Sequence, residues 1–211
     1  EFWYAWRHQL DPLAEAGYRV VAPDLRGYNR SSAPDDVDSY SPDKLVGDVR
    51  GLVEHLGYAR AAIVGHDWGG AIAWEIGIRD PDLVSQLAVL NAPHPEAYQQ
   101  ALTRSPDQLL RSWYVYLFQV PGIPEWLLQA DDYRAIDEML TETAAPGAFS
   151  ESDVQRYKDA MARSGSVSGP LNYYRAVGRE TVRRRLRSAV PGSQARYTTV
   201  RVPTLVIWGE Q

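Results

Sequence analysis

Residues 63–74 read Ile63-Val64-Gly65-His66-Asp67-Trp68-Gly69-Gly70-Ala71-Ile72-Ala73-Trp74. The apolar run at residues 61–64 is typical of a buried strand, and the apolar stretch after Gly70 is typical of a helix. Small residues two before and two after a reactive side chain mark a nucleophile elbow, a sharp strand-to-helix turn that exposes its apex residue. We expect Gly65 and Gly69 to leave the room that the backbone needs there. The apex residue is Asp67, and the alternative interpretation is an ordinary glycine-rich turn.

An aspartate at the apex of such a turn points to a particular chemistry. A carboxylate attacks amides poorly, but it can displace a leaving group from saturated carbon and so form an ester with the enzyme. Hydrolysis of that ester then requires a water molecule activated by a base. Epoxides and alkyl halides are the substrates that suit this two-step reaction.

The order of the expected elements indicates an α/β protein. Strands at 18–22, 61–64 and 83–90 alternate with helices, of which the first two cover 2–17 and 42–56. This alternation is typical of a mainly parallel sheet flanked by helices on both faces. We expect Gly17 to cap the first helix and Ser41 to cap the second.

The pattern becomes helical after residue 95. The candidate helices cover residues 95–104, 106–118, 123–130, 132–140, 150–163 and 169–187. A strand at 202–208 follows. We therefore predict a core at residues 1–95, a helical cap at 96–196 inserted between two strands of the sheet, and a return to the core at 197–211.

Composition excludes several classes of protein. The net charge of -5 over 211 residues gives no electrostatic support for a nucleic-acid partner, and we interpret the arginines at 183–187 as a solvated helix face. The absence of cysteine excludes disulfides and thiol catalysis. No apolar run approaches the roughly 20 residues of a membrane span, so we expect no membrane segment and a cytoplasmic location. Because the sequence begins with Glu1 rather than Met, we expect an internal fragment.

Five segments, in order along nearly the whole chain, resemble the soluble-type epoxide hydrolases of the α/β-hydrolase fold. They are Glu1-Phe2-Trp3-Tyr4-Ala5-Trp6-Arg7, Asp24-Leu25-Arg26-Gly27-Tyr28, Gly65-His66-Asp67-Trp68-Gly69-Gly70, Leu90-Asn91-Ala92-Pro93-His94-Pro95 and Gly169-Pro170-Leu171-Asn172-Tyr173-Tyr174-Arg175. The turn with aspartate is shared with haloalkane dehalogenases, whereas the cap segments favour the epoxide hydrolases.

The resemblance implies roles for individual residues. Asp67 is expected to be the nucleophile, and the backbone N–H of Trp68 is expected to form part of the oxyanion hole. His66 and Trp113 are expected to support or line the pocket.

Two cap tyrosines are expected to donate hydrogen bonds to the epoxide oxygen. The resemblance assigns these roles to Tyr114 and Tyr174. A phenol has a pKa of about 10, so it donates while neutral at pH 7. Alternatively, these residues are amphipathic core tyrosines, or the neighbouring Tyr116 and Tyr173 take their places.

The base histidine and its orienting acid are expected beyond residue 211, and a second oxyanion amide before residue 1. Asn91 stands where some relatives place the acid, but it is no acid. His8 and His55 lie on expected helices and are interpreted as surface or packing residues. His94 is the one alternative base, although its proline neighbours favour a structural role in its loop.

The sequence thus predicts an epoxide hydrolase that opens a small-molecule epoxide with water to a vicinal diol. No metal or organic cofactor is expected, because no metal-ligand spacing is present. Residues 1–211 alone are expected to be inactive. One alternative is a haloalkane or haloacid dehalogenase in which the N–H of Trp68 binds halide. Another is a non-catalytic relative that acts as a ligand-binding or receptor protein.

Overall fold

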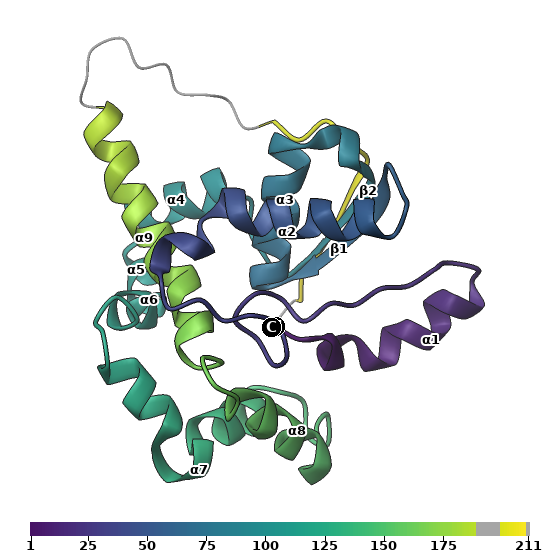
Figure 1. Ribbon diagram of the computed structural model, residues 1–211. Helices are drawn as coiled ribbons and strands as arrows, with labels where there is room; N and C mark the ends of the chain where they lie inside the picture. Colours follow the sequence, from purple (N-terminus) through teal and green to yellow (C-terminus); the bar gives the residue numbers. More distant parts are fainter. Residues whose placement is uncertain (189–198, 210–211) are drawn as a thin grey trace. The chain divides into compact units, whose positions relative to one another are not determined.

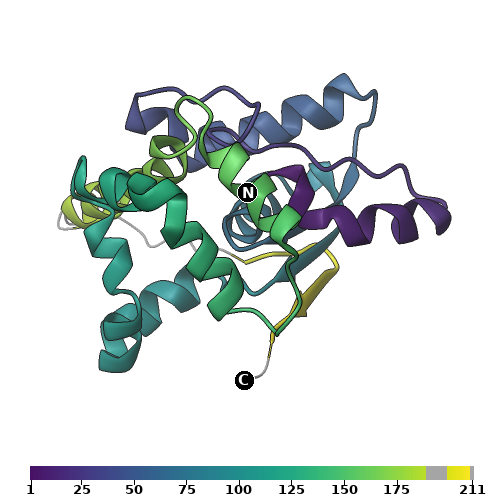
Figure 2. The same ribbon diagram turned by 90° about the horizontal axis from the view of Figure 1, so that it is seen from below.

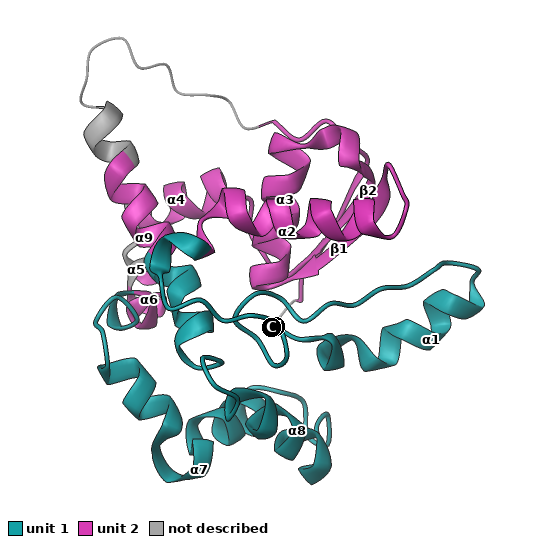
Figure 3. Ribbon diagram, viewed as in Figure 1, with its two compact units in different colours: residues 1–39, 116–175 teal, residues 40–115, 176–211 magenta. Residues whose placement is uncertain are grey.

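The computed structural model describes residues 1–188 and 199–209. The chain forms two compact units, and each unit is assembled from two separate stretches of sequence (Figure 3). Unit 1 comprises residues 1–39 and 116–175, and unit 2 comprises residues 40–115 and 176–211. The division into core and cap at residues 95 and 196 concerns function rather than compactness, and it stays a prediction. Residues 189–198 and 210–211 of that division lie outside the described residues.

Unit 2 contains a parallel sheet of three described strands. These are β1 (Ala61–His66), β2 (Val84–Leu90) and β3 (Thr204–Ile207), in the order β1-β2-β3 (Figure 1). In the register, His66 lies beside Leu90, and Leu90 lies beside Ile207. The carboxyl ends of all three strands therefore meet at one edge of the sheet.

Two helices of unit 2 pack on the sheet or on each other. α3 (Trp68–Arg79) packs against β1 and β2, and α2 (Pro42–His55) packs against α3 (Figure 1). Ile72 and Ile76 of α3 are buried together with Val84 and Leu87 of β2. α2 begins after Ser41 as expected, with proline in the first helical position where its missing N–H costs nothing, but the Ser41 side chain makes no capping hydrogen bond. The predicted parallel sheet flanked by helices is therefore confirmed.

The region between β2 and β3 is helical, as the sequence predicts. Its helices are α4 (Pro95–Arg104), α5 (Pro106–Arg111), α6 (Trp113–Leu117), α7 (Ile123–Glu142), α8 (Glu151–Met161) and α9 (Ser168–Ser188). The single helix expected at 106–118 is wrong, because the chain breaks at Ser112, the C-cap of α5. The expected boundary near residue 131 appears inside α7, where residues 130–133 leave helical geometry.

Unit 1 begins with a short 3₁₀ helix, η1 (Trp3–Trp6), and α1 (Arg7–Glu15), and it also contains α7, α8 and the start of α9, residues 168–175. Gly17, with φ of 90°, follows the end of α1 as predicted. α7 and α8 lie side by side in both views (Figures 1 and 2) and bury Ile136, Leu140 and Val154 between them.

The strand expected at residues 18–22 is wrong. The described sheet contains β1, β2 and β3 but not this segment. An extended chain becomes a strand only when a neighbouring strand supplies a ladder of hydrogen bonds.

Within the described part of the chain, no helix combines the length and apolarity that crossing a membrane requires.

Candidate active site

The turn between β1 and α3 places Asp67 in an unusual backbone conformation. Its φ of 50° and ψ of -121° lie where a residue with a side chain rarely stands. The Asp67 carbonyl accepts the Ala71 N–H at 2.9 Å, which begins the helix. The Asp67 side chain makes no capping hydrogen bond to α3 and is exposed. The chain thus turns sharply at Asp67, and the carboxylate of this residue is exposed and is not used to cap α3.

The tight backbone contacts of this turn occur at Gly65 and Gly70, and not at Gly65 and Gly69 as the sequence led us to expect. A Cβ on Gly65 would lie 2.2 Å from the carbonyl oxygen of Gly69, so Gly65 is where the backbone approaches itself most closely. A Cβ on Gly69 would meet nothing within 4 Å. The expectation that the backbone needs a glycine at position 69 to make room is therefore wrong. Gly70 is the second tight position, since its Cβ would lie 2.5 Å from the Cβ of Ala92.

Tyr114 lies in α6, within the same unit as Asp67. Partial burial raises the pKa of Tyr114 above its ordinary value, and electrostatic interaction with the nearby Tyr98 and with the Asp67 carboxylate raises it further. The phenol of Tyr114 therefore lies within electrostatic range of the Asp67 carboxylate. It remains a neutral O–H donor over a wider pH range than a free tyrosine does.

A small polar network lies at the start of α6. Ser112 is buried, and its hydroxyl accepts a hydrogen bond from the Gln108 side-chain amide at 3.0 Å. The hydroxyl of Tyr98 lies 3.4 Å from the same oxygen. Ser112 immediately precedes Trp113-Tyr114, so this network fixes the backbone that carries Tyr114. Sequence reasoning missed Tyr98, because no local pattern connects α4 with residue 112.

Trp113, His66 and Trp68 also lie in unit 2. Trp113 is largely exposed, whereas His66 and Trp68 are half-buried. Trp68 is the first residue of α3, and the partial positive charge at a helix N-terminus favours an anion beside its N–H. The pocket roles of Trp113 and His66 stay predictions.

Tyr174 lies in unit 1, and its environment differs from that of its neighbour Tyr173. Tyr173 is fully buried, and its hydroxyl donates to the carbonyl oxygen of Arg26 at 2.8 Å. Tyr174 is half-buried, and its ring packs edge-on against Phe118 at 4.9 Å between centroids. The hydroxyl of Tyr173 thus serves the packing of unit 1, which favours Tyr174 as the donor of this pair.

His94 has a structural position. Its Nδ1 accepts the backbone N–H of Glu96 at 3.3 Å, which caps α4, and its ring packs edge-on against Trp74. Trp74 in turn donates from Nε1 to the carbonyl oxygen of Ala92 at 3.0 Å. These contacts account for His94 as the residue that orients the loop after β2, as its proline neighbours suggested.

Asn91 joins the ends of two strands. Its backbone N–H donates to Ile207 at 2.9 Å, and its side-chain oxygen accepts the N–H of Gly209 at 2.8 Å. Its φ of 47° is in the left-handed region, which asparagine tolerates better than most residues do. The sequence shows only that Asn91 is no acid; the contact with residue 209 depends on strand pairing and could not be found locally.

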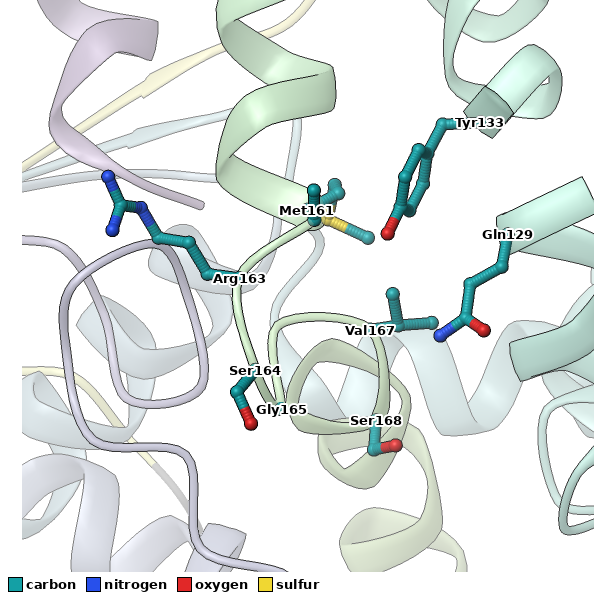
Figure 4. Close-up of a pocket in the computed structure, with 9 residues that line it drawn as sticks. Gln129, Tyr133, Met161, Arg163, Ser164, Gly165, Val167 and Ser168 are labelled. Carbon is teal, nitrogen blue, oxygen red and sulfur yellow. The ribbon is translucent and has the colours of Figure 1, made fainter. Parts of the chain in front are cut away.

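A cavity of about 160 Å³ lies within unit 1, between the break in α7 and the segment that joins α8 to α9 (Figure 4). The side chains of Tyr133 and Met161 point toward one another there, and the side-chain amide of Gln129 points toward Val167 (Figure 4). None of the site residues predicted from the sequence lines this cavity. Across the described residues, no group of three or more histidine or carboxylate side chains is placed to hold a metal ion.

Comparison with known proteins identifies the relatives of this chain. A model of the alpha/beta hydrolase fold family matches residues 2–211. The AB hydrolase superfamily protein YfhM of Bacillus subtilis is 40% identical over 209 residues, with 99% of this chain and 69% of that protein covered. Epoxide hydrolase 4 of Mus musculus is 38% identical over 216 residues, with 100% and 56% covered.

The solved structures that resemble this chain include epoxide hydrolases as well. An epoxide hydrolase mutant from Bacillus megaterium, crystallised with its diol product, matches with a TM-score of 0.83 and 33% identity, covering 100% of this chain and 73% of that one. Among the curated relatives, the chain spans 69% of YfhM but 56% of the mouse protein.

Proposed function

Because the chain belongs to the α/β-hydrolase fold family, we propose that the protein containing it is an epoxide hydrolase that works through an ester on Asp67. The observation that carries the proposal is the turn between β1 and α3, where Asp67 stands at a φ of 50° with its carboxylate exposed and unused in capping. The strain at this residue is of the kind found at functional sites. Similarity to epoxide hydrolases supports the choice of substrate.

The first step is attack by the Asp67 carboxylate on an epoxide carbon. A C–O bond forms to Asp67, the C–O bond of the ring breaks, and its electron pair goes to the ring oxygen. That oxygen is a poor leaving group unless a proton reaches it. Tyr114 and Tyr174 are proposed to donate hydrogen bonds to it and to supply the proton. The raised pKa of Tyr114 suits this role, since it keeps the phenol protonated until the alkoxide forms.

The second step is hydrolysis of the ester. A base takes a proton from water, and the resulting hydroxide attacks the carboxyl carbon of Asp67. The oxyanion that forms is stabilised by the N–H of Trp68 at the start of α3. The oxyanion then collapses, the ester C–O bond breaks, and the vicinal diol leaves with the hydroxyl proton of the intermediate, which restores the Asp67 carboxylate. The proton held by the base passes to the tyrosinate that gave up its own proton in the first step. We propose that the base is a histidine outside residues 1–211, because His94 is occupied in capping α4.

The test is a single turnover of the full-length protein, in excess over a styrene-oxide-like epoxide, in water enriched in oxygen-18. An ester mechanism delivers an unlabelled oxygen from Asp67 to the diol and leaves the heavy isotope in the Asp67 peptide. Direct attack by water would label the diol instead and would overturn the ester proposal.

Two variants and one substrate complete this test. Asp67→Asn is expected to abolish turnover, since a neutral amide is no nucleophile. Asp82→Asn, at an exposed position of η3 (Pro81–Leu83) before the amino end of β2, should keep the wild-type rate. Release of halide from an alkyl halide, with no hydrolysis of epoxides, would replace the proposal with a dehalogenase. Binding of epoxide without turnover of either class would favour the ligand-binding alternative.

A further inference from the structure

The side chain of Arg175 is the most heavily hydrogen-bonded cation of unit 1 for which contacts are described. Its guanidinium donates to both carboxylate oxygens of Glu125, at 2.7 and 3.1 Å. The two side chains are only 11% and 18% exposed. Paired hydrogen bonds of this kind fix orientation as well as distance. Arg175 and Glu125 therefore form a rigid, largely buried pair between α9 and the start of α7.

The same guanidinium holds the loop between α6 and α7. Its Nε donates to the carbonyl oxygen of Phe118 at 2.9 Å, and a second nitrogen donates to that of Val120 at 3.1 Å. Glu125 completes the arrangement, because it also accepts the N–H of Gly122 at 2.9 Å. Burial by itself raises the pKa of Glu125, but hydrogen bonds from Arg175 and the backbone outweigh it, and the net pKa is lowered. The loop at 118–122 is thus fixed to α9.

This loop returns to Tyr174, the residue next to Arg175. Gln119 donates from its side-chain amide to the carbonyl oxygen of Tyr174 at 3.1 Å. The ring of Phe118 packs edge-on against the ring of Tyr174, with 4.9 Å between centroids and an angle of 73°. The chain of contacts therefore closes: Arg175 fixes the backbone of residue 118, and Phe118 fixes the ring of Tyr174.

We infer that Arg175, paired with Glu125, is a positioning residue that sets the orientation of the Tyr174 ring and hence the donation of its hydroxyl to the epoxide oxygen. The inference rests on the proposed function of Tyr174. Lysine cannot replace arginine here, since one ammonium group cannot reach two carboxylate oxygens and two carbonyl oxygens in the fixed fork that arginine provides. A donor displaced by a fraction of an ångström still binds substrate but transfers its proton less well.

The experiment measures the rate of ester formation on Asp67 in the full-length protein by rapid quenching and intact mass. Arg175→Lys is expected to slow ester formation by about 10-fold to 100-fold while KM changes little. In a Tyr174→Phe background, the same substitution should change the rate by no more than about twofold, because the hydroxyl that it orients is gone. Arg134→Lys, at an exposed pair with Glu138 in α7, is the matched control and should keep the wild-type rate.

Glu125→Gln keeps the size of the side chain and removes its charge. It is a second route to the same test if Arg175→Lys does not fold. It should slow ester formation in the wild-type background and have no further effect in the Tyr174→Phe background. Losses that multiply in the two backgrounds, or an unchanged rate for Arg175→Lys, would overturn the positioning role. If the wild-type protein forms no ester at all, the proposed function has failed, which is a different and distinguishable result.

Discussion

The turn at Asp67 and the segment at Tyr174 each present one polar side chain, but they hold it in different ways. The backbone fixes the position of Asp67. Gly65 lies directly against the carbonyl of Gly69, and Asp67, between these two glycines, has a positive φ. The position of Tyr174 is instead fixed by two side chains, those of Arg175 and Phe118. The first arrangement is local in sequence, whereas the second joins residues more than fifty positions apart.

This difference predicts how each region responds to change. A backbone contact leaves no room for adjustment, so a single added methyl group must open the turn. A side-chain network can relax when one member is replaced, so its losses are graded. We therefore expect a substitution at the close approach of Gly65 to act on folding and on activity together, and substitutions of Tyr174 and of the side chains that position it to act mainly on rate.

The largest effect is expected from Gly65→Ala. The new Cβ would lie 2.2 Å from the carbonyl oxygen of Gly69 and 2.7 Å from the backbone nitrogen of Gly70, and neither atom can rotate away. We expect a loss of about 3 kcal/mol or more in the free energy of unfolding, together with loss of turnover. Urea denaturation and a rate assay on the full-length protein measure both.

Gly69→Ala is the matched control for this comparison. Its Cβ would meet nothing within 4 Å, and alanine is favoured over glycine inside a helix by roughly 0.5–1 kcal/mol. We expect unchanged or slightly higher stability and a wild-type rate. Equal damage from both substitutions would show that the close approach at Gly65 is not what shapes the turn.

The next effect concerns the two tyrosines that are proposed as hydrogen-bond donors, Tyr114 and Tyr174. Tyr174→Phe removes the proposed donor, and general-acid assistance is worth about 10²–10⁴-fold in rate. Because Tyr114 can partly substitute, each single phenylalanine variant should lose less than the double variant, which should be essentially inactive. Steady-state rates on a styrene-oxide-like epoxide measure these losses.

Tyr173→Phe is the control for the tyrosine series. It removes a buried hydrogen bond to Arg26 and should cost about 1–2 kcal/mol of stability with little change in rate. A double variant of Tyr114 and Tyr174 that keeps the wild-type rate would show that the donors are assigned wrongly.

Sequence reasoning succeeded where structure is encoded locally. The parallel strands β1 and β2, the turn at Asp67 and the helical region after residue 95 follow from apolar runs and glycine spacing. It failed at residues 18–22, because whether an extended segment becomes a strand depends on a neighbour that the local pattern does not specify.

The site could be predicted only in part for the same reason. Asp67 and Gly65 stand in a motif that can be recognised from a few residues. The contact of Asn91 with residue 209 and that of Arg175 with Glu125 join separate elements. No spacing rule connects such residues, and only the folded chain brings them together.

A third effect is on pH dependence. Burial, together with electrostatic interaction with Tyr98 and the Asp67 carboxylate, raises the pKa of Tyr114 above the ordinary value of about 10. In Tyr174→Phe, where Tyr114 is the remaining donor, activity should persist above pH 10 and fall only as the pH passes through this raised value. A pH–rate profile, with phenolate absorbance compared with that of Tyr114→Phe, tests this. Loss of activity well below pH 10, in step with phenolate formation at residue 114, would contradict it.

The smallest effect is expected in α8, another part of unit 1 held by side chains. Hydrogen bonds from the hydroxyl groups of Ser150 and Tyr4 and from the Ser150 N–H, with Arg7 nearby, hold the pKa of Asp153 well below its ordinary value. A lowered pKa means that Asp153 stabilises the fold above its unfolded value of about 3.9, and that this contribution is lost as the pH falls further.

Asp153→Asn should therefore cost about 1 kcal/mol of stability at pH 7, the usual value of a lost N-terminal cap, and the difference from wild type should shrink below about pH 4. Asp159→Asn, an exposed residue near the other end of α8 that pairs with Gln155, removes a negative charge from a helix C-terminus. That change should leave stability equal or slightly higher. Urea melts of the full-length protein at pH 7 and pH 3 measure both variants. A cost for Asp153→Asn that stays constant across this range would mean that its charge contributes nothing and that only the size and shape of the side chain matter.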